Sequence, residues 1–237
     1  MPANAGIQLA NGGERNKNWM GDMLKIWGRR NSANVQKVLW LAAEVGLNYE
    51  HIAAGGSFGG LNEPSFRALN PHGRIPVLQD GDLAIWESHA ILRYLAARYG
   101  DERFWPENPA GRSQSDEWMD WAQTSFQPAF LNGVFRGYYR TPEEQRDWPA
   151  IRKSLHACNE QLHLIDRVLS RHPFLGGSSF SLADIPAGTL LYRYFELDID
   201  RPNLANVEAW YARLRERKAY RENVMIPFDE LRGKLSF

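Results

Sequence analysis

Short apolar runs alternate with helical stripes over the first part of the chain. The run "LKIWG" from Leu24 predicts a strand, and apolar residues spaced three and four apart then predict a helix that ends near Gly46. The run "YEHIAA" from Tyr49 predicts a second strand, followed by a glycine-rich loop and a short helix over residues 63–69. This alternation is typical of an α/β domain.

A hairpin and one more helix complete this part. The runs "IPVLQ" and "LAIWE" flank the tripeptide "DGD", which favours a tight turn between antiparallel strands. Ser88 then begins an apolar-periodic helix that reaches Tyr99. The predicted order is therefore β-α-β-α-β-β-α, in a domain over residues 23–100.

The second part of the chain is predicted to be entirely helical. The segment "GDERFWPENPAGR" combines glycine, proline and charge, and marks a linker over residues 101–110. Apolar residues at helical spacing recur through residues 111–237. There the motif "FSLADI" from Phe180 has the capping-box and hydrophobic-staple pattern that begins a core helix. The expected fold class is an α/β domain followed by an all-α domain.

The beginning of the chain shows no targeting signal. Residues 1–22 are polar and glycine-rich, and we expect a disordered extension before a plausible natural start at Met23. They lack the apolar core of a signal peptide, and no apolar run in the sequence is long enough to cross a bilayer. We therefore expect a cytoplasmic protein that has no membrane partner.

Charge and cysteine content exclude several classes of function. The 237 residues contain 28 Lys and Arg against 28 Asp and Glu, so there is no basic surplus for a nucleic-acid partner. The single cysteine, Cys158, allows no intrachain disulfide and lies on an apolar helical stripe, where it is expected in the core. The six histidines show no HExxH motif and no zinc-type pairing with cysteine, so no metal is predicted.

The segment "NPHGRIPVLQDGDLAIWESHAILRYL", from Asn70 to Leu95, resembles the cytosolic glutathione S-transferases. The resemblance is to the bacterial serine-type members (theta-, phi- or nu-like). It implies a thioredoxin-like first domain in which Pro76 follows a cis peptide bond, a geometry open to X-Pro bonds. It also implies that the backbone of Ile75 pairs with the cysteinyl part of glutathione, and that the protein is a homodimer.

Glu87 and Ser88 suit the γ-glutamyl end of glutathione. If Ser88 begins a helix, its N–H and hydroxyl lie at the positive end of the helix dipole, where a carboxylate is favoured. The neighbouring Glu87 carboxylate would hold an ammonium group. Taken without the resemblance, a serine cap preceded by glutamate is a common structural feature.

The stretch "RRNSANVQKV" from Arg29 to Val38 raises the question of which residue contacts the thiol. Ser32 suits a helix N-cap, but the resemblance places it at the position of the thiol-activating hydroxyl. Some bacterial relatives use an amide two residues later, which here is Asn34. Neither tyrosine nor cysteine occurs between Leu24 and Leu41, so classes that use those residues at this position are excluded.

A hydroxyl donor at a helix N-terminus is sufficient to activate a thiol. A free thiol has a pKa of about 8.5, and lowering this pKa by two units requires that the thiolate be stabilised over the thiol by about 2.7 kcal/mol. One hydrogen bond to a charged group supplies about 1.5–3 kcal/mol. The helix N-terminus adds about 0.3–1 kcal/mol. No general base is then needed.

Two further parts of the site are open at this point. Plant-type serine enzymes hold the glycyl carboxylate with a basic pair, at positions that read Leu61-Asn62 here, so Asn62 and Arg74 are candidates, with Arg29 or Arg30 as alternatives. The hydrophobic electrophile is expected between the domains. Its candidate aromatic residues, which at helical spacing are also compatible with the core, are Trp118, Trp121, Phe126, Phe135, Tyr138 and Tyr139.

The leading functional hypothesis is a glutathione transferase that attacks a hydrophobic electrophile by conjugation, substitution or peroxide reduction. A glutathione-disulfide or disulfide-bond reductase of the nu-like type is favoured if Asn34 faces the sulfur. A non-catalytic glutathione-binding or regulatory protein on the same fold is the alternative outside the enzymes.

Overall fold

The computed structural model describes residues 23–235, so the predicted N-terminal extension over residues 1–22 lies outside it. Its first half contains a four-stranded sheet in the order β2-β1-β3-β4, with β1 and β2 parallel and the other pairs antiparallel. The strands are β1 (Leu24–Trp27), β2 (Tyr49–Ile52), β3 (Val77–Asp80) and β4 (Leu83–Trp86). The helices are α1 (Ala33–Glu44), α2 (Pro64–Leu69) and α3 (Ser88–Tyr99), which confirms the predicted β-α-β-α-β-β-α order.

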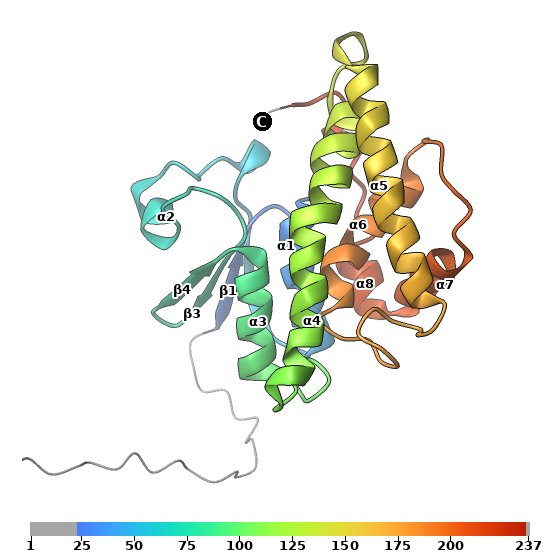
Figure 1. Ribbon diagram of the computed structural model, residues 1–237. Coiled ribbons are helices and arrows are strands. Elements are labelled where there is room, and N and C mark those ends of the chain that lie inside the picture. Colours follow the sequence, from blue (N-terminus) through green and yellow to red (C-terminus); the bar gives the residue numbers. More distant parts are fainter. Residues whose placement is uncertain (1–22, 236–237) are drawn as a thin grey trace, which may run out of the picture.

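Alternating side chains place helices on both faces of this sheet. Ile26 and Leu78 are 0% exposed and belong to the core shared with α1 and α3. Their neighbours Trp27 and Val77 point to the opposite face, where the Trp27 ring packs edge-on against Phe66 of α2 at 5.9 Å between centroids. In Figure 1, α2 accordingly lies on the outer side of the sheet, away from the helical half of the molecule.

The second half is helical, as predicted. Helix α4 (Pro109–Trp121) starts within the predicted linker and continues through two segments of π-helical geometry, η2 (Ala122–Phe126) and η3 (Pro128–Arg140). Pro128 lacks a backbone N–H, so the regular i→i−4 ladder is interrupted between these segments. The remaining helices are α5 (Trp148–Leu169), α6 (Asp184–Glu196), α7 (Ala205–Glu216) and α8 (Lys218–Asn223), with 3-10 turns η1 (Gly56–Phe58), η4 (Glu143–Gln145) and η5 (Asp229–Leu231).

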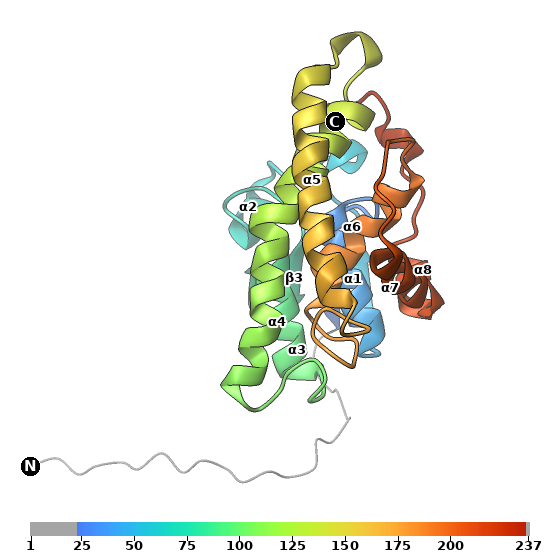
Figure 2. The same ribbon diagram turned by 45° about the vertical axis from the view of Figure 1, so that its right-hand side comes forward.

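Helix α1 joins the two halves. It packs on α3 on one side and on α6 and α8 on the other, as the views in Figures 1 and 2 show. Residues 33–42 are all buried except Asn34, which is half-buried. The two ends of α1 therefore lie at the contact between the sheet domain and the helical half.

The capping motif at α6 secures the helical core. The Asp184 carboxylate, 0% exposed, accepts hydrogen bonds from the Leu175 N–H (2.9 Å), the Ser181 N–H (3.0 Å) and the Trp210 indole (3.0 Å). Cys158 is also buried, and burial raises the pKa of its thiol to about 12, so this thiol is a core side chain. No helix in the described range 23–235 is long and apolar enough to span a membrane.

Candidate active site

The site residues meet at one edge of the sheet because of the strand register. Trp27 of β1 lies opposite Val77 of β3, and Val77 lies opposite Trp86 of β4. The residues that follow β1, precede β3 and follow β4 therefore emerge at the same edge. Helices α1 and α3 both begin there, so the segments around Ser32, Pro76 and Ser88 are brought together.

Gly28 allows these segments to approach closely. It follows β1 with φ 142°, and a Cβ placed on it would lie 2.5 Å from Cγ2 of Val35 and 3.1 Å from Cβ of Ile75. Any side chain here would push the first turn of α1 away from the residue before Pro76. The Ile75–Pro76 peptide bond is cis, as the sequence predicted.

Ser32 occupies the N-cap of α1 but does not use its side chain there. Its backbone is extended (φ −86°, ψ 123°), its N–H donates to the Arg29 carbonyl at 3.1 Å, and its carbonyl accepts from the Gln36 N–H at 2.9 Å. The hydroxyl makes no capping hydrogen bond. A half-buried hydroxyl at a positive helix end is thus left to another partner.

Asn34 lies in the first turn of the same helix. Its Oδ1 atom is buried and has no hydrogen-bond partner within residues 23–235. Buried polar atoms are normally satisfied, so an unpartnered one marks a place where a ligand or a functional constraint is expected. Ser32 and Asn34 therefore both remain candidates for contact with a sulfur atom.

Glu87 and Ser88 form the start of α3. Glu87 is exposed and has φ 69° and ψ 117°, and it is the one non-glycine residue with positive φ among residues 23–235. Such a conformation costs about 1–3 kcal/mol and is concentrated at functional sites. Ser88 follows as the first residue of α3 and is only 3% exposed. The strained residue thus presents its carboxylate beside a helix N-terminus, as binding of an amino acid headgroup requires.

The candidates for a second carboxylate differ in what they already contact. Asn62 accepts a hydrogen bond from the Arg67 guanidinium at 2.8 Å. Arg30 donates to the Glu222 carbonyl of α8 at 3.0 Å, and Arg29 donates to the Asn31 side chain. Arg29 and Arg30, two of the three arginines proposed for the glycyl carboxylate, thus already form hydrogen bonds with protein groups near the first turn of α1. The Arg74 side chain, next to Ile75, is exposed and forms no ion pair within the described range.

A buried polar cluster behind the site was missed in the sequence. Lys37 of α1 is 1% exposed, and its Nζ lies 2.8 Å from Oε1 of Gln127 and 3.2 Å from Nε2 of His89. Burial lowers the pKa of Lys37 to about 7, against the attraction of Glu87. Burial and the nearby Lys37 and Arg93 charges lower the pKa of His89 to about 2, so its ring is neutral. The cluster connects α1, α3 and the helical half.

Several of the proposed electrophile-pocket residues are in the core. Phe126, Phe135 and Tyr139 are 0%, 2% and 4% exposed, so in this structure they belong to the core and do not line an open cleft. The reason is that Phe126 stacks on Trp121 at 5.6 Å and 4° and is enclosed by neighbouring helices. Trp118, Trp121 and Tyr138 are half-buried, and their role stays a prediction.

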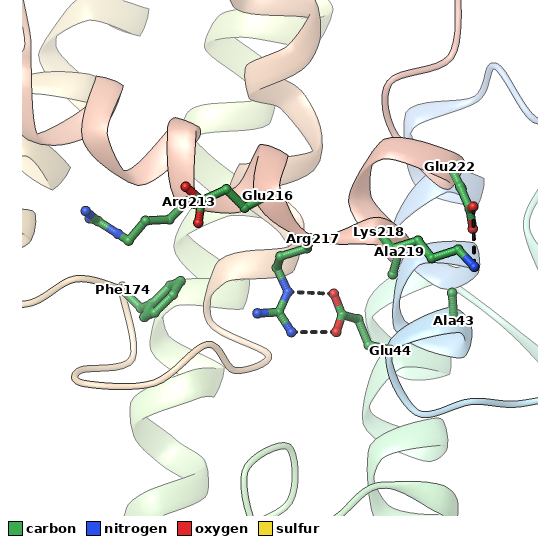
Figure 3. Close-up of a pocket in the computed structure, with 9 residues that line it drawn as sticks. All are labelled: Ala43, Glu44, Phe174, Arg213, Glu216, Arg217, Lys218, Ala219 and Glu222. Atoms are coloured by element: carbon green, nitrogen blue, oxygen red, sulfur yellow. Dashed lines mark hydrogen bonds and ion pairs between the residues drawn. The ribbon is translucent and has the colours of Figure 1, made fainter.

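A hollow of about 660 Å³ lies at the opposite end of α1, away from Ser32. Figure 3 shows its lining, in which the Glu44 carboxylate faces the Arg217 guanidinium. The residues that line it come from the end of α1, the loop around Phe174, and helices α7 and α8. None of the residues proposed from the sequence belongs to it.

No group of three or more His, Cys, Asp or Glu side chains within residues 23–235 is arranged to hold a metal ion.

Comparison with known proteins identifies the family. The model of "Glutathione S-transferase, N-terminal domain" matches residues 23–97, and that of "Glutathione S-transferase, C-terminal domain" matches residues 119–218. The chain is 42% identical over 207 residues to glutathione S-transferase GstB of Escherichia coli strain K12, covering 86% of this chain and 99% of that protein. It is 32% identical over 214 residues to glutathione S-transferase F14 of Arabidopsis thaliana, covering 85% and 80%.

Solved structures agree. The theta class glutathione S-transferase from Xanthomonas axonopodis pv. citri, crystallised with glutathione bound, superposes with a TM-score of 0.82 at 48% identity, covering 86% of this chain and 98% of that one. A glutathione S-transferase from Pseudomonas fluorescens superposes with a TM-score of 0.74 at 31% identity, covering 83% and 96%. The chain belongs to the glutathione S-transferase family.

Proposed function

We propose that the protein binds glutathione at the edge of the sheet and that Ser32 activates its thiol for attack on a hydrophobic electrophile. The observation that carries the proposal is the uncommitted hydroxyl of Ser32 at the N-terminus of α1, on the same edge as cis-Pro76 and Ser88. A hydroxyl that does not cap its own helix is free to donate to a thiolate. The resulting hydrogen bond supplies about 1.5–3 kcal/mol, most of what activation requires.

The rest of glutathione follows from the neighbouring groups. The backbone N–H and C=O of Ile75 are held beside Pro76 and suit the cysteinyl peptide groups. Ser88 and the α3 N-terminus suit the γ-glutamyl carboxylate, and Glu87 suits the ammonium group. Arg74 is the cation proposed for the glycyl carboxylate. The theta class relative from Xanthomonas axonopodis pv. citri was solved with glutathione bound, which supports glutathione as the ligand.

Asn34 carries the second candidate activity, a glutathione-disulfide or disulfide-bond reductase. Its position favours it, because the half-buried Asn34 lies in the first turn of α1, two residues after Ser32, and its side-chain NH2 group is a hydrogen-bond donor that suits a thiolate. In that case the thiolate attacks a disulfide sulfur and releases a second thiolate, rather than forming a thioether.

Three measurements test the proposal. Retention on immobilised glutathione and a thermal shift in millimolar glutathione test binding. Turnover of an activated aryl chloride, an organic hydroperoxide and glutathione disulfide then assigns the reaction. Conjugation of the aryl chloride supports the Ser32 assignment, whereas turnover of the disulfide alone supports the Asn34 assignment. Binding without any turnover would identify a non-catalytic glutathione-binding protein, and failure to bind would refute all three.

We also infer that the protein is a cytoplasmic enzyme. We infer in addition that it is a homodimer, and that the electrophile is held near Trp118, Trp121 and Tyr138. The homodimer is inferred from the family, and analytical ultracentrifugation at micromolar concentration tests it. Substitution of each of these aromatic residues by alanine tests the electrophile site, through the KM for the electrophile at a fixed glutathione concentration.

A further inference from the structure

Arg193 of α6 crosses from the helical half to the beginning of α1. Its residue is 3% exposed, and its Nη2 atom donates to the Asn31 carbonyl at 2.6 Å. The guanidinium also lies over the rings of Phe135 (5.0 Å) and Phe228 (5.8 Å). The same Nη2 atom lies 3.4 Å from Oε1 of Gln36 in α1. Arg193 therefore connects an aromatic-lined position in the helical half with the backbone just before α1 and with the first turns of that helix.

The charge environment of Arg193 is unusual for a structural arginine. Within residues 23–235 no carboxylate forms an ion pair with Arg193, and the positive charges of Arg29 and Arg140 disfavour its own charge. Burial and these like charges lower the pKa of Arg193 to about 9. Burial of a cation without a carboxylate is costly, so stability alone does not account for an arginine here.

The acceptor of this hydrogen bond is the peptide group that leads into Ser32. The Asn31 carbonyl and the Ser32 N–H belong to the same peptide plane. The N–H side of this plane donates to the Arg29 carbonyl at 3.1 Å, and the carbonyl side accepts from Arg193. Both edges of the plane are thus fixed, which sets the direction in which the Ser32 side chain leaves the backbone.

The residues on either side of this peptide are also held by the helical half. The Asn31 side chain donates to the Glu230 carboxylate, and Arg30 donates to the Glu222 carbonyl at 3.0 Å. Arg193 is the central contact of this set because it binds the backbone itself, and because its planar guanidinium has a fixed orientation against aromatic rings.

We propose that Arg193 is a positioning residue for thiol activation, which aims the Ser32 hydroxyl by holding the Asn31–Ser32 peptide from the helical half of the molecule. The proposal rests on the function proposed above for Ser32. It assigns to the second domain, expected to hold the electrophile, a separate role in preparing the nucleophile.

The test compares Arg193→Met with Arg193→Lys and with a matched control, Arg217→Met. Arg217 is also an arginine of the helical half that contacts α1, but it pairs with Glu44 at the far end of that helix. Thiolate absorbance of bound glutathione gives the thiol pKa, and steady-state kinetics separate kcat from the KM for glutathione. Hydrogen exchange of residues 29–35 in the glutathione-free protein reports the order of the loop directly.

Arg193→Met should raise the bound thiol pKa by about 0.5–1 unit and lower kcat by about threefold to tenfold near pH 6.5, as expected for one lost hydrogen bond. The KM for glutathione should change by less than about twofold, because the groups around Pro76 and Ser88 are untouched. Amides in residues 29–35 should exchange faster. Arg193→Lys should restore part of each effect, and Arg217→Met should show none of them.

The inference is overturned if Arg193→Met keeps the wild-type thiol pKa and the wild-type exchange of residues 29–35. If Arg193→Met does not fold, Arg193→Lys decides by the same two readouts, since it keeps the charge but loses the fixed plane of the guanidinium. A wild-type protein that binds glutathione without forming thiolate would instead refute the proposed role of Ser32, and this inference with it. That failure is recognised because Arg217→Met would then lack the thiolate as well.

Discussion

The two ends of helix α1 are both held by an arginine from the helical half, but in different ways. At the C-terminal end, Arg217 forms two hydrogen bonds with the Glu44 carboxylate, at 2.7 and 2.6 Å, and the pair lines a hollow open to solvent. At the N-terminal end, Arg193 is buried and binds only uncharged groups, chiefly the Asn31 carbonyl.

The difference indicates that Arg217 contributes to stability, whereas Arg193 holds the segment that carries the reactive Ser32. A paired arginine at the edge of the solvent contributes to the free energy of folding and can be exchanged with little effect on geometry elsewhere. A buried cation that binds a backbone carbonyl is costly, and what it determines is a conformation. The reactive end of α1 also has the buried Lys37 and the unpartnered Asn34 oxygen, whereas the far end has paired charges.

The largest effect is expected at the reactive end, from Ser32→Ala. Loss of the hydroxyl donor should raise the pKa of the bound glutathione thiol by about 1–2 units and lower kcat near pH 6.5 by about 10- to 100-fold. The KM for glutathione should stay within about threefold. Thiolate absorbance and steady-state kinetics measure both quantities. An unchanged titration in Ser32→Ala, together with a shifted one in Asn34→Ala, would move the role to Asn34.

The next effect concerns Lys37, which is buried and contacts Gln127 and His89. The negative charge of Glu87 favours its protonated form, but burial disfavours that form more strongly. Below pH 7 the lysine is protonated in both the folded and the unfolded state, and the folded state bears the cost of the buried charge. Burial lowers its pKa from 10.5 to about 7, so between these values the unfolded chain binds more protons and the free energy of unfolding rises with pH.

Lys37 should therefore contribute a rise of about 2 kcal/mol in the free energy of unfolding between pH 7 and pH 9. Lys37→Met, which has a similar length and no charge, should lose that contribution. Urea unfolding at pH 7, 8 and 9 measures the slope in each protein. Equal slopes for the wild type and Lys37→Met would contradict the assignment of this titration.

A smaller effect is expected at the far end of α1. Arg217→Met should lower the free energy of unfolding by about 1–2 kcal/mol, because the Glu44 carboxylate, 8% exposed, loses its cationic partner. The Trp40 indole still donates to Glu44 at 2.9 Å, which limits the loss. A double-mutant cycle with Glu44→Gln measures the coupling. If Arg217→Met also shifted the pKa of the bound glutathione thiol, the two ends of α1 would not differ in their effect on thiol activation.

The smallest effect is expected for Lys218→Ala, beside the same hollow. Lys218 and Glu222 are 3.8 Å apart and their side chains are 80% and 59% exposed. An exposed pair of this kind contributes less than about 0.5 kcal/mol, and salt screens it further. Urea unfolding at low and high salt measures this, and a loss above 1 kcal/mol would show that the hollow orders these side chains more than their exposure indicates.

The order of elements was readable from the sequence because each one obeys a local rule. The strand and helix periodicities, the turn at Gly81 and the start of α3 at Ser88 are set by neighbouring residues. The aromatic pocket was less readable. Aromatic residues at helical spacing suit both a core and a cleft, and only packing placed Phe126 in the core.

The buried polar residues could not be assigned from the sequence for a related reason. Gln36 and Lys37 look like the solvent face of an amphipathic helix, yet both are 1% exposed because α1 is enclosed by helices on two sides. The sequence therefore carried no signal that Lys37 is buried, and its partners His89 and Gln127 lie 52 and 90 residues away in the chain.

The sequence by itself determined the family, the order of the elements and the short motifs around Ser32, Pro76 and Ser88, because these depend on local chemistry and on patterns within a few residues. The tertiary structure alone decided which ends of strands and helices meet and which polar groups are buried. It also decided that Arg193 binds the peptide before Ser32 across 162 residues of sequence. The physical reason is that burial and long-range hydrogen bonding arise only when the two halves pack around α1.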